Sequence, residues 1–173
     1  MEERILECMS KITPATLLAG QTWYDDAQSF AQSLSPYFGS LEHSAAVIAA
    51  LSPRVHWKRN KAAAAAMADG QIPTVLKRSY LAAQRALASD DPIGTLKGRK
   101  TNSFAKNIAG DMNAVTIDMW AWKVISDEPI SKLGNKGVYD AAANAYRKVA
   151  SELGMTPAQL QATCWVIVRG RAH

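Results

Sequence analysis

The sequence predicts an all-α protein, on three observations. Apolar residues recur every three or four positions through most of the chain, which is the period of an amphipathic helix. Proline, glycine and capping residues separate these segments by short connections, as is usual between helices. Alternating, strand-like patterns are weak and limited to short apolar runs such as residues 114–117. We therefore expect about eight helices and very little else.

Four helices are expected in the first half: residues 1–12, 23–34, 41–51 and 57–68. Thr22 is a candidate N-cap of the second, and Ser35-Pro36 should end it, because proline cannot continue the hydrogen-bond ladder. The third follows Ser40 and is apolar on nearly every side, which indicates burial. A turn at Gly70 should end the fourth.

The expected helices of the second half are residues 73–88, 101–109, 118–125, 138–153 and about 157–168. Asp118 opens the third of these after an apolar run, which is a typical N-cap position. Gly154 should end the fourth, and Thr156-Pro157 should begin the last.

Composition sets limits on the class of protein. With 173 residues, 48% of them hydrophobic, the chain can bury one good core as a single compact unit. No apolar run is long enough to span a membrane, and the acidic start of the chain is unlike a signal peptide, so a cytoplasmic protein is expected. Neither Cys8 and Cys164 nor the histidines have ligand spacing, so we expect no disulfide framework, no metal and no cofactor.

Positive charge is concentrated in the middle of the chain. The net charge is +5, but residues 53–106 alone carry eleven basic and three acidic side chains. Such clustering favours a polyanionic partner, because each neutralised phosphate releases counterions. The alternative is an ordinary solvated helix face.

Two segments carry the candidate chemistry: residues 98–102, Gly-Arg-Lys-Thr-Asn, and residues 115–118, Val-Thr-Ile-Asp. A carboxylate such as Asp118 can stabilise the oxocarbenium-like sugar formed when a glycosidic bond breaks, and it also fits a plain N-cap. An amine forms a Schiff base only when neutral, which the positive neighbours of Lys100 favour. The alternative for Lys100 is a contact to a phosphate.

In order along the chain, these segments resemble the helix-hairpin-helix DNA glycosylases of the endonuclease III type. Residues 46–54 look like the family's apolar helix ending in Leu-Ser-Ala-Gln, and residues 60–62 match its Asn-Lys-Ala. Residues 98–102 look like its Gly-Arg-Lys-Thr-Ala-Asn segment, and residues 115–118 like Val-Asp-Thr-His, with a similar spacing from lysine to aspartate. The resemblance covers roughly residues 41–125. Small bacteriophage proteins share a similar pattern.

The resemblance implies a two-lobed helix-hairpin-helix DNA glycosylase-like fold without an iron–sulfur cluster, since the four-cysteine loop is absent. The central lobe with the hairpin would be residues 22–110, and the second lobe residues 1–21 plus 111–173. Asp118 and Lys100 would be the catalytic pair, beside a cleft. The chain departs from the family in a hairpin about two residues shorter with one glycine, and in Met119-Trp120 where the family has Thr-His.

Ten further residues are predicted to contact DNA: Arg54, His56, Trp57, Lys58, Arg59, Lys97, Gly98, Arg99, Thr101 and Trp120. Arg54 holds the position of the family's glutamine that fills the gap left by a flipped nucleotide. Trp57 lies within a basic stretch, as on many nucleic-acid surfaces, with core packing as its alternative. Trp23 and Trp165 are expected in the core.

The resulting function hypothesis is a DNA glycosylase that flips a damaged or modified base out of double-stranded DNA and cleaves its glycosidic bond, with or without lyase activity. One alternative is a non-catalytic phage protein that binds DNA or interferes with host DNA metabolism on the same fold. Another is an enzyme that modifies bases in phage DNA. The expected location is the cytoplasm, that of the host cell if the protein is phage-encoded.

Overall fold

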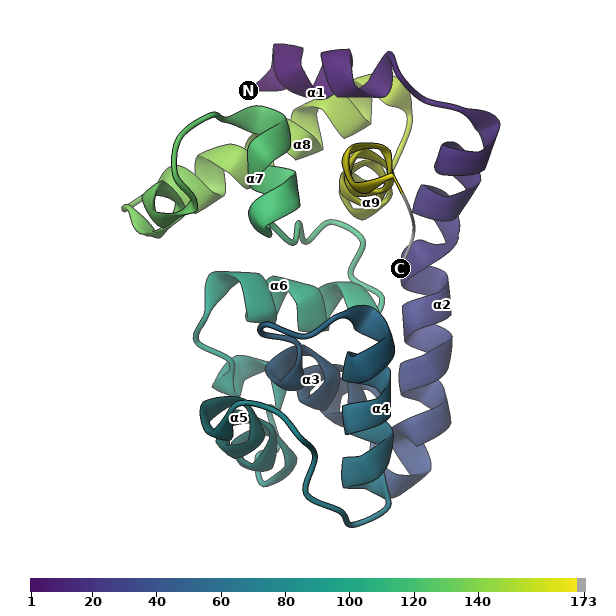
Figure 1. The fold of residues 1–173 in the computed structure, drawn as a ribbon, viewed down its shortest axis with the longest axis vertical. Coiled ribbons are helices and arrows are strands. Elements are labelled where there is room, and N and C mark those ends of the chain that lie inside the picture. The colour runs from purple at the N-terminus through teal and green to yellow at the C-terminus, as the bar shows by residue number, and fades with distance from the viewer. Residues whose placement is uncertain (171–173) are drawn as a thin grey trace. The chain divides into compact units, whose positions relative to one another are not determined.

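In the computed structural model, which describes residues 1–170, the protein forms nine α-helices and two short 3-10 helices, with no strand in that range (Figure 1). The all-α prediction is confirmed. The helices are α1 Glu2–Met9, α2 Pro14–Phe38, α3 Leu41–Leu51, α4 Trp57–Ala68, α5 Lys77–Leu87, η1 Ile93–Thr95, α6 Arg99–Ile108, α7 Met119–Ile125, η2 Ile130–Gly134, α8 Val138–Leu153 and α9 Pro157–Arg169. Over the same residues, no helix is both long enough and apolar enough to cross a membrane.

The chain divides into two compact units. Unit 1 comprises residues 1–25 and the described chain from residue 111 onward, and unit 2 comprises residues 26–110. Helix α2 contributes its first half to unit 1 and its second half to unit 2. Residues 171–173, the end of the predicted second lobe, lie outside the described part of the chain.

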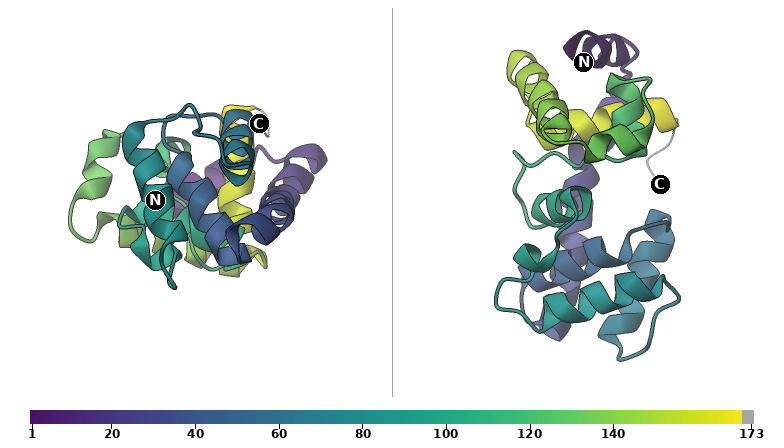
Figure 2. Two further views of the ribbon diagram at one scale, coloured as in Figure 1. Left: turned by 90° about the horizontal axis from the view of Figure 1, so that it is seen from below. Right: turned by 90° about the vertical axis from the view of Figure 1, so that its left-hand side faces the viewer.

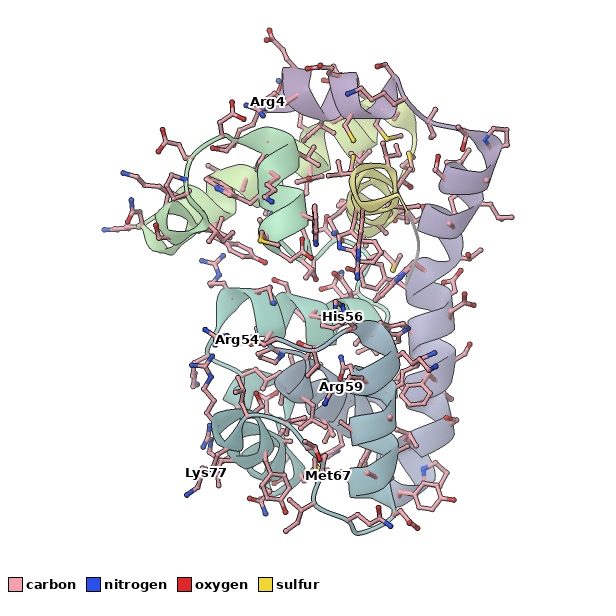
Figure 3. All side chains as sticks on the ribbon, viewed as in Figure 1. Arg4, Arg54, His56, Arg59, Met67 and Lys77 are labelled. Atoms are coloured by element: carbon pink, nitrogen blue, oxygen red, sulfur yellow. The ribbon has the colours of Figure 1, made fainter. Side chains whose placement is uncertain are left out.

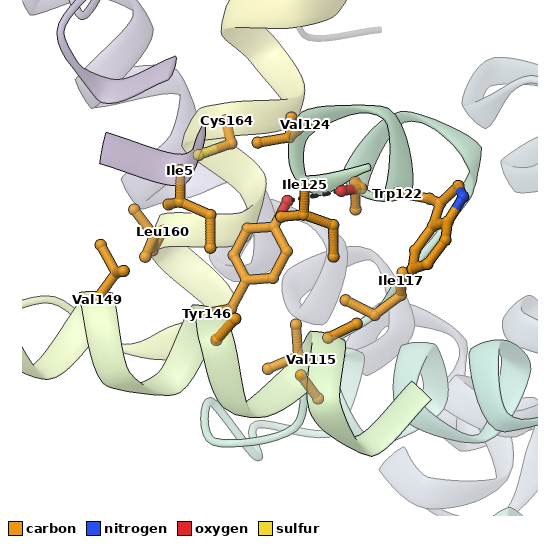
Figure 4. Close-up of a cluster of buried hydrophobic side chains, with 14 of the residues drawn as sticks. Ile5, Val115, Ile117, Trp122, Val124, Ile125, Tyr146, Val149, Leu160 and Cys164 are labelled. Atoms are coloured by element: carbon orange, nitrogen blue, oxygen red, sulfur yellow. Dashed lines mark hydrogen bonds between the residues drawn. The ribbon is translucent and has the colours of Figure 1, made fainter. Parts of the chain in front are cut away.

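Unit 1 is built around a core shared by α1, α7, α8 and α9, in which α1 packs against the other three (Figure 4). Tyr146 of α8 is fully buried in this core, and its hydroxyl donates a hydrogen bond to the carbonyl of Ala121, 2.9 Å away. Ile5 and Leu160 are also fully buried. Each such apolar side chain contributes about 1.5–3 kcal/mol by leaving water.

Helices α2 and α9 approach each other unusually closely in unit 1. Gly20 of α2 lies directly against Thr163 of α9, and a Cβ atom at Gly20 would be 2.5 Å from the Thr163 Cα. Real Cβ atoms essentially never come that near another heavy atom. The position therefore requires glycine, and it fixes the distance at which α9 packs on α2.

Unit 2 is organised around α3, which packs against α4, α5 and α6, and these helices can be followed from two further directions in Figure 2. Residues 44–51 of α3 are all buried, as the apolar sequence predicts. Ser40 is the N-cap of this helix, and its hydroxyl oxygen accepts a hydrogen bond from the backbone N–H of His43. The His43 ring lies 2.7 Å from the Ser40 hydroxyl and 2.8 Å from the carbonyl of Ser89, so this histidine ties α3 to the chain that follows α5.

Helix α2 is longer than the sequence predicts, and Ser35-Pro36 does not end it. It begins at Pro14, with no boundary at Thr22, and it runs through Pro36 to Phe38. Proline cannot donate the backbone hydrogen bond that the carbonyl of Gln32 would otherwise accept. The Ser35 hydroxyl donates to that carbonyl instead, at 2.8 Å. The helix ends at Gly39, whose φ of 106° lies in the left-handed region.

Candidate functional site

Asp118 is the N-cap of α7, as predicted, and both of its carboxylate oxygens accept hydrogen bonds. Oδ1 accepts from the backbone N–H of Ala121 at 2.8 Å. Oδ2 accepts from the indole N–H of Trp165 on α9 at 3.1 Å. One backbone donor and one side-chain donor, from two different helices, therefore hold the carboxylate. The side chain is half-buried.

Trp165 is itself held by two neighbours in unit 1. The Trp23 ring meets it edge to face, with centroids 6.0 Å apart and an interplanar angle of 62°. The guanidinium of Arg169 lies over the Trp165 ring, 4.7 Å from its centroid. Both tryptophans were expected in the core but are only half-buried, and Trp165 connects Asp118 to Trp23.

Two buried tyrosines of α8 fix the backbone on either side of Asp118. The Tyr139 hydroxyl donates to the carbonyl of Val115 at 2.8 Å and accepts from the N–H of Ile117 at 3.0 Å. The Tyr146 hydroxyl bonds to the first turn of α7 through Ala121. Asp118 is therefore placed by α7, α8 and α9 together, and its side chain has a defined direction.

Trp120 lies on α7, two residues after Asp118, and it is half-buried. The Lys123 amine is positioned over its ring, 4.8 Å from the centroid. Met119, beside it, is 46% exposed. The first turns of α7 thus carry an aromatic ring covered by a cation.

Helices α4, α5 and α6 of unit 2 begin in the same unusual way. Within the described residues, each has two consecutive basic residues in its first turn, no acidic residue there and no side-chain cap. The pairs are Lys58-Arg59, Lys77-Arg78 and Arg99-Lys100. Because a helix N-terminus carries about half a positive charge, a basic side chain there costs roughly 0.3–1 kcal/mol. All three starts would be stabilised by an anion.

The basic side chains of unit 2 are mostly free to meet such an anion. Those at the three helix starts and at the turn before α4 that form no salt bridge with any residue in the range 1–170 are Arg54, Lys58, Arg59, Lys77, Arg78 and Lys100. All are exposed except Lys100, which is half-buried. In unit 1, by contrast, Arg4 pairs with Asp127 at 2.6 Å and Lys148 with Glu2 at 2.7 Å.

The segment before α6, where the sequence predicts the hairpin, consists of the short helix η1 and a tight connection into α6. Asn102 of α6 holds this connection, because its side-chain amide donates to the carbonyls of Ile93 and Leu96, at 3.0 and 3.2 Å. Gly98 is the N-cap of α6, and its carbonyl accepts from the Thr101 hydroxyl at 3.0 Å. Helix α6 begins at Arg99, two residues before the predicted start.

Lys97 and Lys100 occupy different places at this turn. The Lys97 amine donates to the carbonyl of Gly94 at 3.1 Å, so it stabilises the connection as well as adding charge. Lys100 is in the first turn of α6 in unit 2, whereas Asp118 belongs to unit 1. Arg99 is exposed and has a partner in the chain.

The turn between α3 and α4 carries Arg54, the one non-glycine residue of the described chain with a positive φ, 61°. Left-handed backbone costs an ordinary residue about 1–2 kcal/mol, and such strain is concentrated at functional sites. Arg54 is exposed, as are His56, the N-cap of α4, and Arg59. Figure 3 labels these three at the turn and at the start of α4, with Lys77 at the start of α5.

Trp57 packs inside unit 2 and does not lie on an open basic surface. Its ring meets Phe30 of α2 and Phe104 of α6 edge to face, with centroids 6.2 and 6.3 Å apart. The Lys61 amine covers the Trp57 ring at 5.5 Å. These contacts are the core packing that was the alternative for Trp57, and a DNA contact by its half-buried side chain stays a prediction. Trp57 connects α2, α4 and α6, and so holds the start of α4 in place.

Sequence reasoning missed Lys77, Arg78 and Trp165. The helix containing the first two was predicted to start at Pro73, which would put the pair in its second turn, but Leu76 is extended and is the N-cap of α5. A basic pair in a first turn is a signal that a correct boundary would have given. No local signal could have found Trp165, which is 47 residues from Asp118 in sequence.

The two cysteines, from opposite ends of the sequence, meet in the core of unit 1 as free thiols. The Cys8 sulfur lies 3.9 Å from the carbonyl oxygen of Cys164. Hydrogen bonding to Cys164 lowers the pKa of Cys8, and the same contact together with burial raises the pKa of Cys164. Among the described residues, no group of histidine, cysteine and acidic side chains is arranged to hold a metal ion.

Fold and side chains together define an all-α protein with a basic helical unit and a second unit that presents a fixed aspartate beside two tryptophans. The chain belongs to DUF7178, a family of unknown function, whose family model matches residues 1–172. The comparison with curated proteins gave no match. The comparison with solved structures gave none either.

Proposed function

We propose that this protein binds double-stranded DNA through unit 2 and cleaves the glycosidic bond of a flipped base, with Asp118 as the acting carboxylate. The finer fold that goes with this function is the helix-hairpin-helix glycosylase-like one, with η1, the connection at residues 96–98 and α6 as its hairpin. The observation that carries the DNA binding is the common design of the starts of α4, α5 and α6.

Three uncapped helix starts, each with two basic residues, are costly for the free protein. Their N-cap residues form no side-chain hydrogen bond to the helix backbone, and the adjacent positive charges oppose the helix dipole. Phosphate groups remove both costs at once, since they accept the N–H bonds and neutralise the basic side chains. A nucleic acid presents phosphates in series, which suits several such sites on one unit.

Asp118 supplies the chemistry in this proposal. When the bond to the base breaks, positive charge develops on the sugar, and a fixed carboxylate stabilises that charge or orients the attacking water. Both oxygens are held by N–H donors, so little reorganisation is needed as the charge develops. Arg54, on its strained turn, is the candidate for filling the gap in the duplex.

Lys100 has a separate role in the proposal. As the second residue of α6, its amine is placed to contact a phosphate together with the backbone at the N-terminus of that helix. Schiff-base chemistry at Lys100, which would add lyase activity, is tested by borohydride trapping on DNA. A Lys100→Ala variant should lose any trapped complex, and trapping at the wild-type level would assign the Schiff base to another amine.

The function is tested with duplexes that carry different altered bases, analysed for free base, strand breaks and the mass of each nucleoside. We expect release of free base by the wild type and none by Asp118→Asn, with DNA binding retained in both. Salt-dependent binding without any product would instead establish the non-catalytic alternative, which the helix starts support equally well. An altered nucleoside mass without base release would establish base modification. Equal release by Asp118→Asn would remove Asp118 from the mechanism.

A further inference from the structure

We propose that Trp165 is a positioning residue for Asp118, whose indole N–H fixes the direction in which the carboxylate meets the sugar of the substrate. This inference rests on the proposed function, because it concerns the same carboxylate. Trp165 itself has no role in the reaction except through Asp118.

Oδ2 of Asp118 accepts a hydrogen bond that its role as an N-cap does not require. Capping α7 uses Oδ1 alone, through the N–H of Ala121. Oδ2 is bonded by a side chain from α9, 47 residues further along the chain. An indole has a single donor and no acceptor, and Trp165 directs that donor at Asp118.

Trp165 is held in place by the well-capped helix α9 and by two neighbouring side chains. Helix α9 begins with a full capping box, in which Thr156 and Gln159 satisfy each other's backbone N–H groups. The contact of Gly20 with Thr163 sets the spacing between α9 and α2, the helix that carries Trp23. Trp23 at the ring edge and Arg169 over the ring face then leave the indole little freedom.

The two hydrogen bonds together restrict the orientation of the Asp118 carboxylate. Hydrogen bonds to both oxygens restrict the rotation of a carboxylate more than a bond to one oxygen does, because together they define the plane of the group. A misplacement of about 1 Å at a reacting group can cost about 100-fold in rate, so this hold is worth a large share of the activity.

The test is Trp165→Phe, which retains an aromatic ring and removes the donor. We expect single-turnover base release to fall about 10- to 100-fold, with the KM for the duplex unchanged within about twofold. The matched control is Trp122→Phe on α7, where the lost indole N–H bonds to the carbonyl of Glu128 and does not reach Asp118. This control should release base at the wild-type rate when both proteins are assayed well below their melting temperatures.

A second readout does not depend on activity. The indole N–H resonance of Trp165, assigned by its loss in Trp165→Phe, should shift in Asp118→Asn while the resonance of Trp122 stays in place. An unshifted Trp165 resonance would overturn the proposal, as would wild-type release by Trp165→Phe in an enzyme that is otherwise active. Absence of product from the wild type on every duplex would instead overturn the proposed function, which keeps the two failures distinct.

Discussion

Reversing the two charges at the start of α4 should make the free protein more stable and its complex with DNA weaker. Lys58 and Arg59 are exposed, form no salt bridge with a described residue and occupy the first turn of a helix without a cap. If these side chains serve to bind a phosphate, they interact unfavourably with the helix N-terminus only while no DNA is bound. Their replacement by glutamate removes that unfavourable interaction from the free protein.

The magnitude follows from the helix dipole. Each reversal removes an unfavourable interaction and adds a favourable one of roughly 0.3–1 kcal/mol. For the double variant Lys58→Glu/Arg59→Glu, with both groups in water, we expect a gain of about 1–2 kcal/mol in the free energy of unfolding at low salt. In a chain of this size that raises Tm by roughly 3–6 °C. Losing two phosphate contacts should reduce the salt slope of DNA binding by about 1.8.

The assay is thermal and chemical denaturation at low and high salt, paired with DNA binding over a range of salt concentrations. The control is Arg85→Glu/Lys106→Glu, which changes the net charge equally but at the last turns of α5 and α6, where positive charge is favourable. The control variant should be less stable than the wild type. Its DNA binding should depend on salt more steeply than that of Lys58→Glu/Arg59→Glu.

Two results would refute the reasoning. If Lys58→Glu/Arg59→Glu is less stable than the wild type at low salt, the start of α4 is not a site of unfavourable charge. If it binds DNA with the wild-type salt slope while the control does not, the contact surface lies at the other ends of these helices.

Three further predictions concern stability. Gly20→Ala should destabilise the protein by about 1–3 kcal/mol, because the new Cβ would overlap the backbone of Thr163; a stabilised variant, as expected for alanine in an open helix, would contradict the close approach. Asn102→Ala should cost about 1–2 kcal/mol and speed hydrogen exchange in the connection before α6, because the carbonyls of Ile93 and Leu96 each lose a hydrogen bond; unchanged exchange would show that the connection is stable without Asn102. Burial raises the pKa of Tyr24 and of Tyr146 above the usual range. These tyrosines stay neutral in the fold while the unfolded chain ionises, so the free energy of unfolding should fall as pH rises above about 10. Phenolate absorbance from two tyrosines should then appear only with unfolding, and its appearance in the folded protein would be the contrary result.

Local patterns were sufficient for much of the fold. The apolar run of α3 predicts a buried helix because burial on every side follows from composition alone. Asp118 was identifiable as an N-cap since a cap depends only on residues within the next turn. The boundaries of α2 and α5 were not predictable in this way. Whether Pro36 ends a helix depends on a substitute donor, and the Ser35 hydroxyl supplies one.

The candidate site also combines features that the sequence predicts with features that only the structure shows. Charge clustering by itself indicates a polyanion partner, because it is a property of composition and order. The basic pair Lys77-Arg78 became significant only once the structure placed it in a first turn. The contacts of Trp57 with Phe30 and Phe104 likewise depend on helices distant in the chain, so only the structure shows them.

The sequence alone determined that this protein is all-helical, that its middle is basic and that Asp118 begins a helix, because each of these depends on neighbours within one or two turns. Only the tertiary structure decided that Trp165 bonds to the second oxygen of Asp118 and that Tyr139 and Tyr146 fix the backbone around it. These partners come from helices remote in the chain, and their approach is set by packing, down to the single glycine that lets α9 reach α2.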